Sequence, residues 1–213
     1  MDKITMQEIV LNELNGKNDW DKLSANCELS EEIIEEFSNK VNWVYISAYQ
    51  HLSEPFIEQH IDIAYLDIII EYQKVSENFI IKYQDKLDWN KVSRHQKLSE
   101  QFIEEFQDRL NWGYISAYQK LSESFIEKHA NKVNWNCIST SQKLSEDFIH
   151  KHRKEINWFQ ISCYQQLSEK FIHEYQNKLS WNRIIKYQNL SKEFIKEHIN
   201  QIPDYLRHDF DDI

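Results

Sequence analysis

A motif of 23 residues repeats along most of this chain without insertions or deletions. The block 98–120, LSEQFIEEFQDRLNWGYISAYQK, is followed directly by 121–143, LSESFIEKHANKVNWNCISTSQK. Eight blocks keep this frame, and they begin at Leu29, Leu52, Val75, Leu98, Leu121, Leu144, Leu167 and Leu190. A fixed period of this kind is the signature of a repeat array, in which each unit buries its apolar face only against its neighbours.

Each repeat has the pattern of two short helices. Ser99 and Asn111 are N-cap residues in the block 98–120, and apolar residues follow each of them at helical spacing. The two apolar stripes are Leu98, Phe102, Ile103, Phe106 and Trp112, Ile115, Tyr118. Neither helix exceeds about ten residues, which is too short for stability alone in water. We therefore predict an all-α fold, an α-solenoid of 23-residue two-helix repeats; an α/3₁₀ superhelix is the alternative.

The repeat frame also divides the chain. Residues 1–28 form a degenerate N-terminal capping repeat, because Trp20 lies one period before Trp43. Residues 29–189 form seven complete 23-residue helical repeats. Pro203 and Asp204 interrupt the pattern, so residues 190–213 are expected to form a C-terminal capping repeat and tail.

The composition argues against catalysis. The 213 residues include only two glycines and two prolines, which excludes glycine-rich phosphate loops, dinucleotide fingerprints and two-residue hairpin turns. No serine lies on a glycine-flanked nucleophile elbow. The carboxylates occupy repeating columns, whereas catalytic pairs need an isolated apolar setting that separates their pKa values. We expect no enzymatic activity and no cofactor.

Cysteines and histidines show no pattern typical of a metal site. Cys27, Cys137 and Cys163 are odd in number and lack metal-type spacing, so we expect free thiols in a reducing cytoplasm. His150 and His173 are one period apart, but no acidic or thiol ligand set accompanies them. Apolar runs are far shorter than the roughly 20 residues of a membrane helix, so no membrane association is expected.

Two further columns are informative. Four histidines share a column with phenylalanine and tyrosine, which indicates that this position needs a flat ring for packing: His60, His129, His152 and His198. A second column holds glutamine in all seven complete repeats: Gln50, Gln73, Gln96, Gln119, Gln142, Gln165 and Gln188. We interpret it as a buried amide ladder that satisfies helix-end carbonyls and turn amides. A ligand-reading role is the alternative, and loss of stability in Gln119→Leu would favour the ladder.

The net charge of −10 is unevenly distributed. Residues 1–74 alone carry a formal charge of −10, whereas residues 75–189 carry +3. Within the seven repeats the first-helix halves are acidic and the second-helix halves mildly basic. The N-terminal third therefore presents a candidate acidic face: Glu31, Glu32, Glu35, Glu36, Glu54, Glu58 and Asp62.

The second-helix face carries the variable and aromatic positions. Tyrosine and arginine are favoured anchors of protein interfaces, so this face is the candidate binding surface. Its residues are Tyr45, Tyr49, Lys91, Arg94, Tyr114, Tyr118, Tyr164, Arg183, Lys186 and Tyr187. The alternative is that the tyrosines pack between repeats and the cations serve only solubility.

The combined pattern Leu-Ser-Glu-x-Phe-Ile and Asn-Trp-x-x-Ile-Ser-x-x-Gln covers residues 29–195. It resembles helical-repeat arrays in uncharacterised proteins of large DNA viruses and bacteriophages. That resemblance implies a setting, a viral or phage protein acting on a host factor in the host cytoplasm. It implies no mechanism.

These observations favour a non-enzymatic binding protein whose helical-repeat surface engages a protein partner. One alternative is binding of an anionic ligand, a nucleotide or single-stranded nucleic acid, on the second-helix face. Another is mimicry of nucleic acid by the acidic N-terminal third. The oligomeric state is left open.

Overall fold

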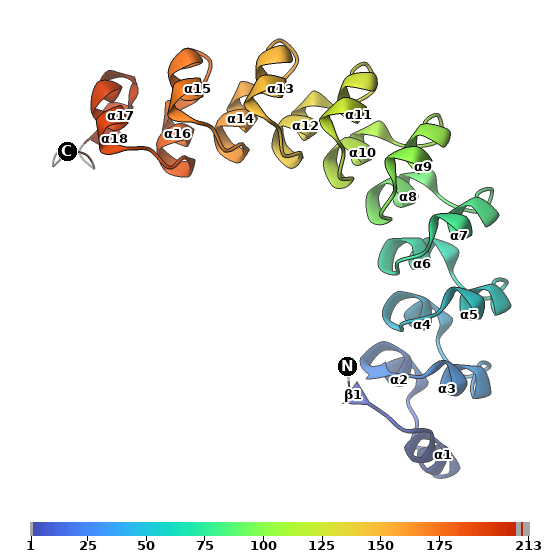
Figure 1. Ribbon diagram of the computed structural model, residues 1–213. Helices are drawn as coiled ribbons and strands as arrows, with labels where there is room; N and C mark the ends of the chain where they lie inside the picture. The colour runs from blue at the N-terminus through green and yellow to red at the C-terminus, as the bar shows by residue number, and fades with distance from the viewer. Residues whose placement is uncertain (1, 208–209, 211–213) are drawn as a thin grey trace. The chain divides into compact units, whose positions relative to one another are not determined.

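The computed structural model describes residues 2–207 and 210, and it confirms an all-α solenoid built from regular helix pairs (Figure 1). The chain divides into two compact units, Met1–Leu110 and Asn111–Ile213. No helix among the described residues is long and apolar enough to cross a membrane.

Nine helices make up the described part of the first unit. They are α1 (Met6–Leu14), α2 (Trp20–Asn26), α3 (Glu31–Glu36), α4 (Trp43–Tyr49), α5 (Glu54–Gln59), α6 (Leu66–Tyr72), α7 (Glu77–Lys82), α8 (Trp89–His95) and α9 (Glu100–Glu105). Two short strands, β1 (Asp2–Lys3) and β2 (Cys27–Glu28), pair in parallel with Asp2 opposite Cys27.

The second unit continues the same alternation. Its described elements are α10 (Trp112–Tyr118), α11 (Glu123–Lys128), α12 (Trp135–Ser141), α13 (Glu146–Lys151), α14 (Trp158–Tyr164), α15 (Glu169–Glu174), α16 (Trp181–Tyr187), α17 (Lys192–Glu197), the 3₁₀ turn η1 (Ile199–Gln201) and α18 (Asp204–Arg207). A repeat thus consists of a six-residue and a seven-residue helix, as in α11 and α12. The predicted N-caps are confirmed in this pair: Ser122 accepts from the amide of Phe125, and Asn134 accepts from those of Asn136 and Cys137.

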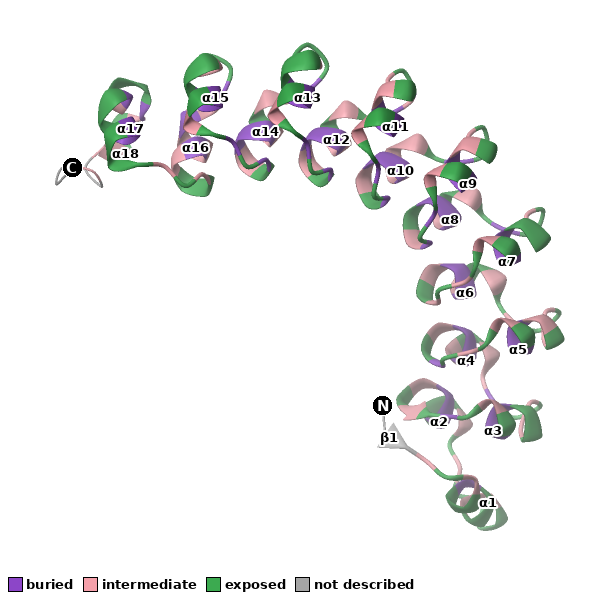
Figure 2. Ribbon diagram, in the orientation of Figure 1, coloured by how far each residue is buried: buried purple, intermediate pink, exposed green. Residues whose placement is uncertain are grey.

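Within each unit the two helices of a repeat lie in two layers (Figure 1). The even-numbered helices α2 to α8 contact one another in sequence in the first unit, and α10 to α16 do so in the second. Buried residues occur in the helices of both layers (Figure 2). In the second unit Ile126 of α11 and Ile138 of α12 are completely buried.

Tryptophan joins consecutive repeats through ring contacts. Trp135 packs against Phe148 and His152 of the next repeat, with ring centroids 6.2 and 4.9 Å apart. Its indole N–H donates to the carbonyl of Ala130 at 3.1 Å. His60 contacts Trp43, and His198 contacts Trp181, in the same way. The prediction that the histidine column needs a flat ring is confirmed.

The first helix pair departs from the others. Helix α1 has nine residues, three more than α3, and is followed by Gly16 at φ +60°. That left-handed conformation favours glycine, because a Cβ would crowd the following carbonyl. The other glycine, Gly113, lies inside α10, where a Cβ would approach the Asn111 side-chain oxygen at 3.2 Å.

Exchange of each glycine for alanine should therefore change stability in opposite directions. Gly16→Ala should lower the free energy of unfolding by about 1 kcal/mol through backbone strain. Gly113→Ala should raise it by up to about 1 kcal/mol through helix propensity, because other repeats accept valine, asparagine and phenylalanine in that column. Urea denaturation measures both. A stabilising Gly16→Ala would contradict the assigned backbone conformation.

Candidate binding surface

The glutamine column forms the amide ladder that the sequence favours. In the second unit, Gln142 Oε1 accepts from the amide of Leu121 at 3.1 Å. Its Nε2 donates to the carbonyls of Ser116 and Gln119, at 3.0 and 2.7 Å. One buried side chain thus satisfies two carbonyls at the end of the preceding second helix and the first amide of its own repeat.

The same three contacts recur along each unit. In the first unit Gln50 bonds Leu29, Ser24 and Cys27. In the second unit Gln165 bonds the corresponding groups one repeat beyond Gln142. Every donor and acceptor of these amides is therefore used within the array. Gln73 and Gln188 are half-buried, and each also bonds the first amide of its repeat and the preceding second helix.

A serine column supplies a second link between repeats. Ser139 is completely buried, and its hydroxyl donates to the carbonyl of Trp135 at 2.7 Å. The same oxygen accepts from the amide of Asn157 in the next repeat at 2.9 Å. Isoleucine replaces this serine at Ile70 and Ile185, so the link is used in most repeats but not all.

The acidic face is largely engaged in contacts between repeats. Glu31 accepts from the amide and hydroxyl of Ser53, and Glu54 accepts from both groups of Ser76. The same clamp joins Glu123 to Ser145 in the second unit. These carboxylates therefore stabilise the first turn of the following repeat.

Two further residues of the acidic face form ion pairs. Glu35 contacts His60 Nε2 at 2.6 Å, and Glu58 pairs with Lys82 Nζ at 2.7 Å. The hydrogen bond from Glu58 raises the pKa of Lys82. The remaining members, Glu32, Glu36 and Asp62, are exposed. The sequence did not reveal that four of the seven carboxylates contact side chains or backbone of the next repeat.

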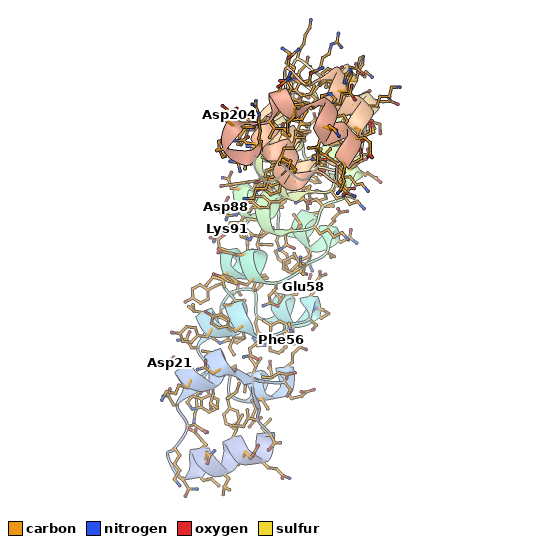
Figure 3. All side chains as sticks on the ribbon, turned by 90° about the vertical axis from the view of Figure 1, so that its left-hand side faces the viewer. Asp21, Phe56, Glu58, Asp88, Lys91 and Asp204 are labelled. Atoms are coloured by element: carbon orange, nitrogen blue, oxygen red, sulfur yellow. The ribbon has the colours of Figure 1, made fainter. Side chains whose placement is uncertain are left out.

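The predicted cations of the second-helix face divide into two groups. Lys91 Nζ lies 3.2 Å from Glu71 of the preceding repeat, and this hydrogen bond lowers the pKa of that carboxyl. Arg183 lies over the ring of Phe159 at 5.1 Å. Both side chains are half-buried, whereas Arg94 and Lys186 are exposed. Figure 3 shows Lys91 and Glu58 on opposite sides of the first unit, with Asp21 and Asp88 on the side of Lys91.

The tyrosine column is exposed. Its members in the first unit are Tyr49 and Tyr72, and those in the second are Tyr118, Tyr164 and Tyr187; their exposed fractions range from 47 to 61 %. We call these five residues the tyrosine row. The structure buries Ile115 and half-buries Trp112 but leaves Tyr118 exposed, so only two of the three expected stripe members face the core. About half of each side chain in the tyrosine row is therefore open to solvent.

Neighbouring rings of the row are ordered against one another. In the first unit Tyr49 lies 6.1 Å from Tyr45 and 6.5 Å from Tyr72, measured between ring centroids. A hollow of about 230 Å³ lies beside them, lined by Tyr49, Tyr72, Leu52 and Lys74 among others. In the second unit Tyr114 and Tyr118 make the same contact at 6.1 Å. The rings therefore present flat, partly preordered surfaces.

Sequence reasoning missed several exposed apolar residues next to the row. Val44 and Phe159 occupy one variable column, and both are exposed. The signal was present, because this column changes from repeat to repeat and accepts apolar side chains. It also missed a cluster of His173, Glu197 and His198 on the first-helix layer.

Comparison with protein-family models, with curated proteins and with solved structures finds no match for this chain.

Replacement of Gln142 by leucine should destabilise the array, because two carbonyls and one amide lose their buried partner. We expect a decrease of about 2–4 kcal/mol in the free energy of unfolding. Gln166→Leu is the matched control, since Gln166 is exposed and should shift stability by less than about 0.5 kcal/mol. Equal stabilities of the two variants in urea would refute the ladder.

Acid should weaken the contacts between repeats. The hydrogen bond from Lys151 lowers the pKa of Glu127 below its usual value of 4.5. A lowered folded-state pKa contributes stability above the unfolded value, and this contribution is lost as the pH falls through the folded value. We therefore measure the urea concentration at the unfolding midpoint from pH 6 to pH 3. This midpoint should decrease once the pH is below about 4.5, and the decrease should be smaller in Glu127→Gln. The exposed Glu155→Gln should keep the wild-type slope.

Proposed function

We propose that this chain is a non-enzymatic binding protein whose tyrosine row engages a protein partner. The observation that carries this proposal is the exposure of large aromatic rings at the same place in five repeats. Tyrosine is enriched at interface hot spots because a rigid, amphipathic ring contributes a large contact area at a small entropic cost.

The contacts of the polar columns support this choice of face. Hydrogen bonds between repeats engage the glutamine column, the buried serine column and the carboxylates, such as Glu31, that bond the serine of the next repeat. The tyrosine row differs from these columns, because about half of each of its side chains is open to solvent. Columns that surround it, such as the one containing Val44 and Phe159, vary between repeats. A tyrosine that recurs in five of seven complete repeats, with variable neighbours, suits selective binding of one partner.

The same contacts argue against the alternatives. Nucleic-acid mimicry requires free carboxylates, yet Glu31, Glu35, Glu54 and Glu58 all have partners in the adjoining repeat. Recognition of a nucleotide or single strand requires cations beside the rings; Lys91 is paired with Glu71, whereas Lys186 is exposed and lies over the Tyr187 ring, so the salt test below decides this alternative. The resemblance to viral and phage arrays makes a host protein the favoured partner.

The test removes the rings of the second unit. In a triple variant, Tyr118→Ser, Tyr164→Ser and Tyr187→Ser, partner capture should fall at least tenfold, because each lost hot-spot ring costs about 1–2 kcal/mol. Serine already occupies this column at Ser141, so the fold should persist. Quantitative capture from host lysate, with thermal unfolding as the folding check, measures the effect.

The control variant places three serines on the first-helix layer, away from the tyrosine row. Asp147→Ser, Lys170→Ser and Glu193→Ser change exposed residues of the column that contains Ser124. This variant should capture the partner as the wild type does. Equal loss in both variants, or no captured protein at near-physiological salt, would contradict the proposal. Salt-sensitive binding of a single-stranded oligonucleotide would instead favour the anionic-ligand alternative.

A further inference from the structure

Two histidines and a carboxylate converge on the first-helix layer of the second unit, away from the tyrosine row. His173 comes from α15, Glu197 is the last residue of α17, and His198 is its C-cap. One ligand atom from each lies within 4.8 Å of the others. A hollow of about 280 Å³ adjoins them, lined by Glu169, Lys170, His173, Phe194 and Glu197.

The hydrogen bonds orient one histidine for coordination. His198 is 4 % exposed, and its Nδ1–H donates to the carbonyl of Phe194 at 3.0 Å. In the neutral ring Nε2 then carries the lone pair, and it lies 2.8 Å from His173 Nδ1. Metal-ligating histidines have this arrangement, in which one ring nitrogen donates to a backbone carbonyl and the other binds the ion.

We propose that His173 Nδ1, His198 Nε2 and a Glu197 carboxylate oxygen form a binding site for Zn²⁺ or a similar divalent transition metal. Imidazole and carboxylate are the ligands these ions prefer, and two histidines with one glutamate leave the fourth tetrahedral position to water. The ion takes the place of the shared proton, and His173 carries its proton on Nε2 instead. Tetrahedral coordination requires the two nitrogens to separate to about 3.4 Å, and the exposed His173 side chain has room to move.

The other repeats of this unit provide an internal comparison. One repeat before the proposed site, His150 and Glu174 approach to 3.4 Å. Tyr175 stands there in the column of His198, and its hydroxyl contacts His150. Two repeats before the proposed site, Glu127 lies 2.7 Å from Lys151 Nζ and 3.5 Å from His152 Nε2, so this set has one histidine and a lysine. Among the described residues of the second unit, only the set that contains His173 combines two histidines with a carboxylate.

The proposed site connects α15 and α17, which are the first helices of two consecutive repeats. His173 belongs to one repeat, and Glu197 and His198 belong to the next. A bound ion therefore links α15 to α17 and stabilises the closing repeat, where fewer neighbours contribute packing.

Titration of the full chain with Zn²⁺ alone tests the proposal. The wild type should bind one equivalent, and Zn²⁺ should raise its thermal midpoint. His198→Phe should weaken binding by at least 10- to 100-fold, the usual cost of losing even an outer-sphere partner. The fold should persist, because Phe37 and Phe106 occupy the same column. His152→Phe is the matched control and should keep wild-type affinity.

Tyr175→His provides the converse test. It completes a second set with His150 and Glu174, so the stoichiometry should rise from one to two. Co²⁺ should then show tetrahedral absorption of twice the intensity. The proposal would be overturned if the wild type failed to bind Zn²⁺ or if His198→Phe kept wild-type affinity. It would also be overturned if His152→Phe lost as much affinity as His198→Phe, or if Tyr175→His bound a single equivalent.

Discussion

The glutamine side chain that spans two repeats is the contact on which the rest of the structure depends. A seven-residue helix has four carbonyls at its end without partners inside the helix. Gln142 bonds two such groups of the preceding repeat and one amide of its own. Because a buried backbone group without a partner is costly, a repeat is complete only when the next one supplies its glutamine. Stacking is therefore a requirement of the helix length.

This requirement explains why the period is constant. Gln142 reaches groups 21, 23 and 26 residues earlier, and the Ser139 hydroxyl accepts an amide 18 residues later. One inserted residue would displace all of these partners together. The first helix pair has no such glutamine, because Cys27 occupies that column one period before Gln50. Parallel pairing of β1 with Cys27–Glu28 supplies backbone hydrogen bonds at that place instead.

Much of the fold follows from one sequence because each column is sampled many times. Ser122 and Asn134 as N-caps, the buried isoleucines and the flat-ring column are all visible in the pattern. The pattern does not show which partner a column has in the neighbouring repeat. Glu31 and Ser53 are 22 residues apart, and His173 and His198 are 25 apart. Such pairs become visible only when the stacking offset of the helices is known, which depends on packing geometry.

The sequence names the tyrosines of the candidate surface, but it does not show which residues of the second-helix stripe are exposed. Trp112, Ile115 and Tyr118 share a spacing of three residues, yet their environments differ from buried to exposed. A spacing of three drifts around a helix that turns every 3.6 residues, so the third member leaves the core face within one short helix. Tyrosine persists at this position even though the core does not require it. Five of the seven complete repeats keep tyrosine there, and this recurrence at an exposed position is the basis of the proposal that the ends of the second helices bind a partner.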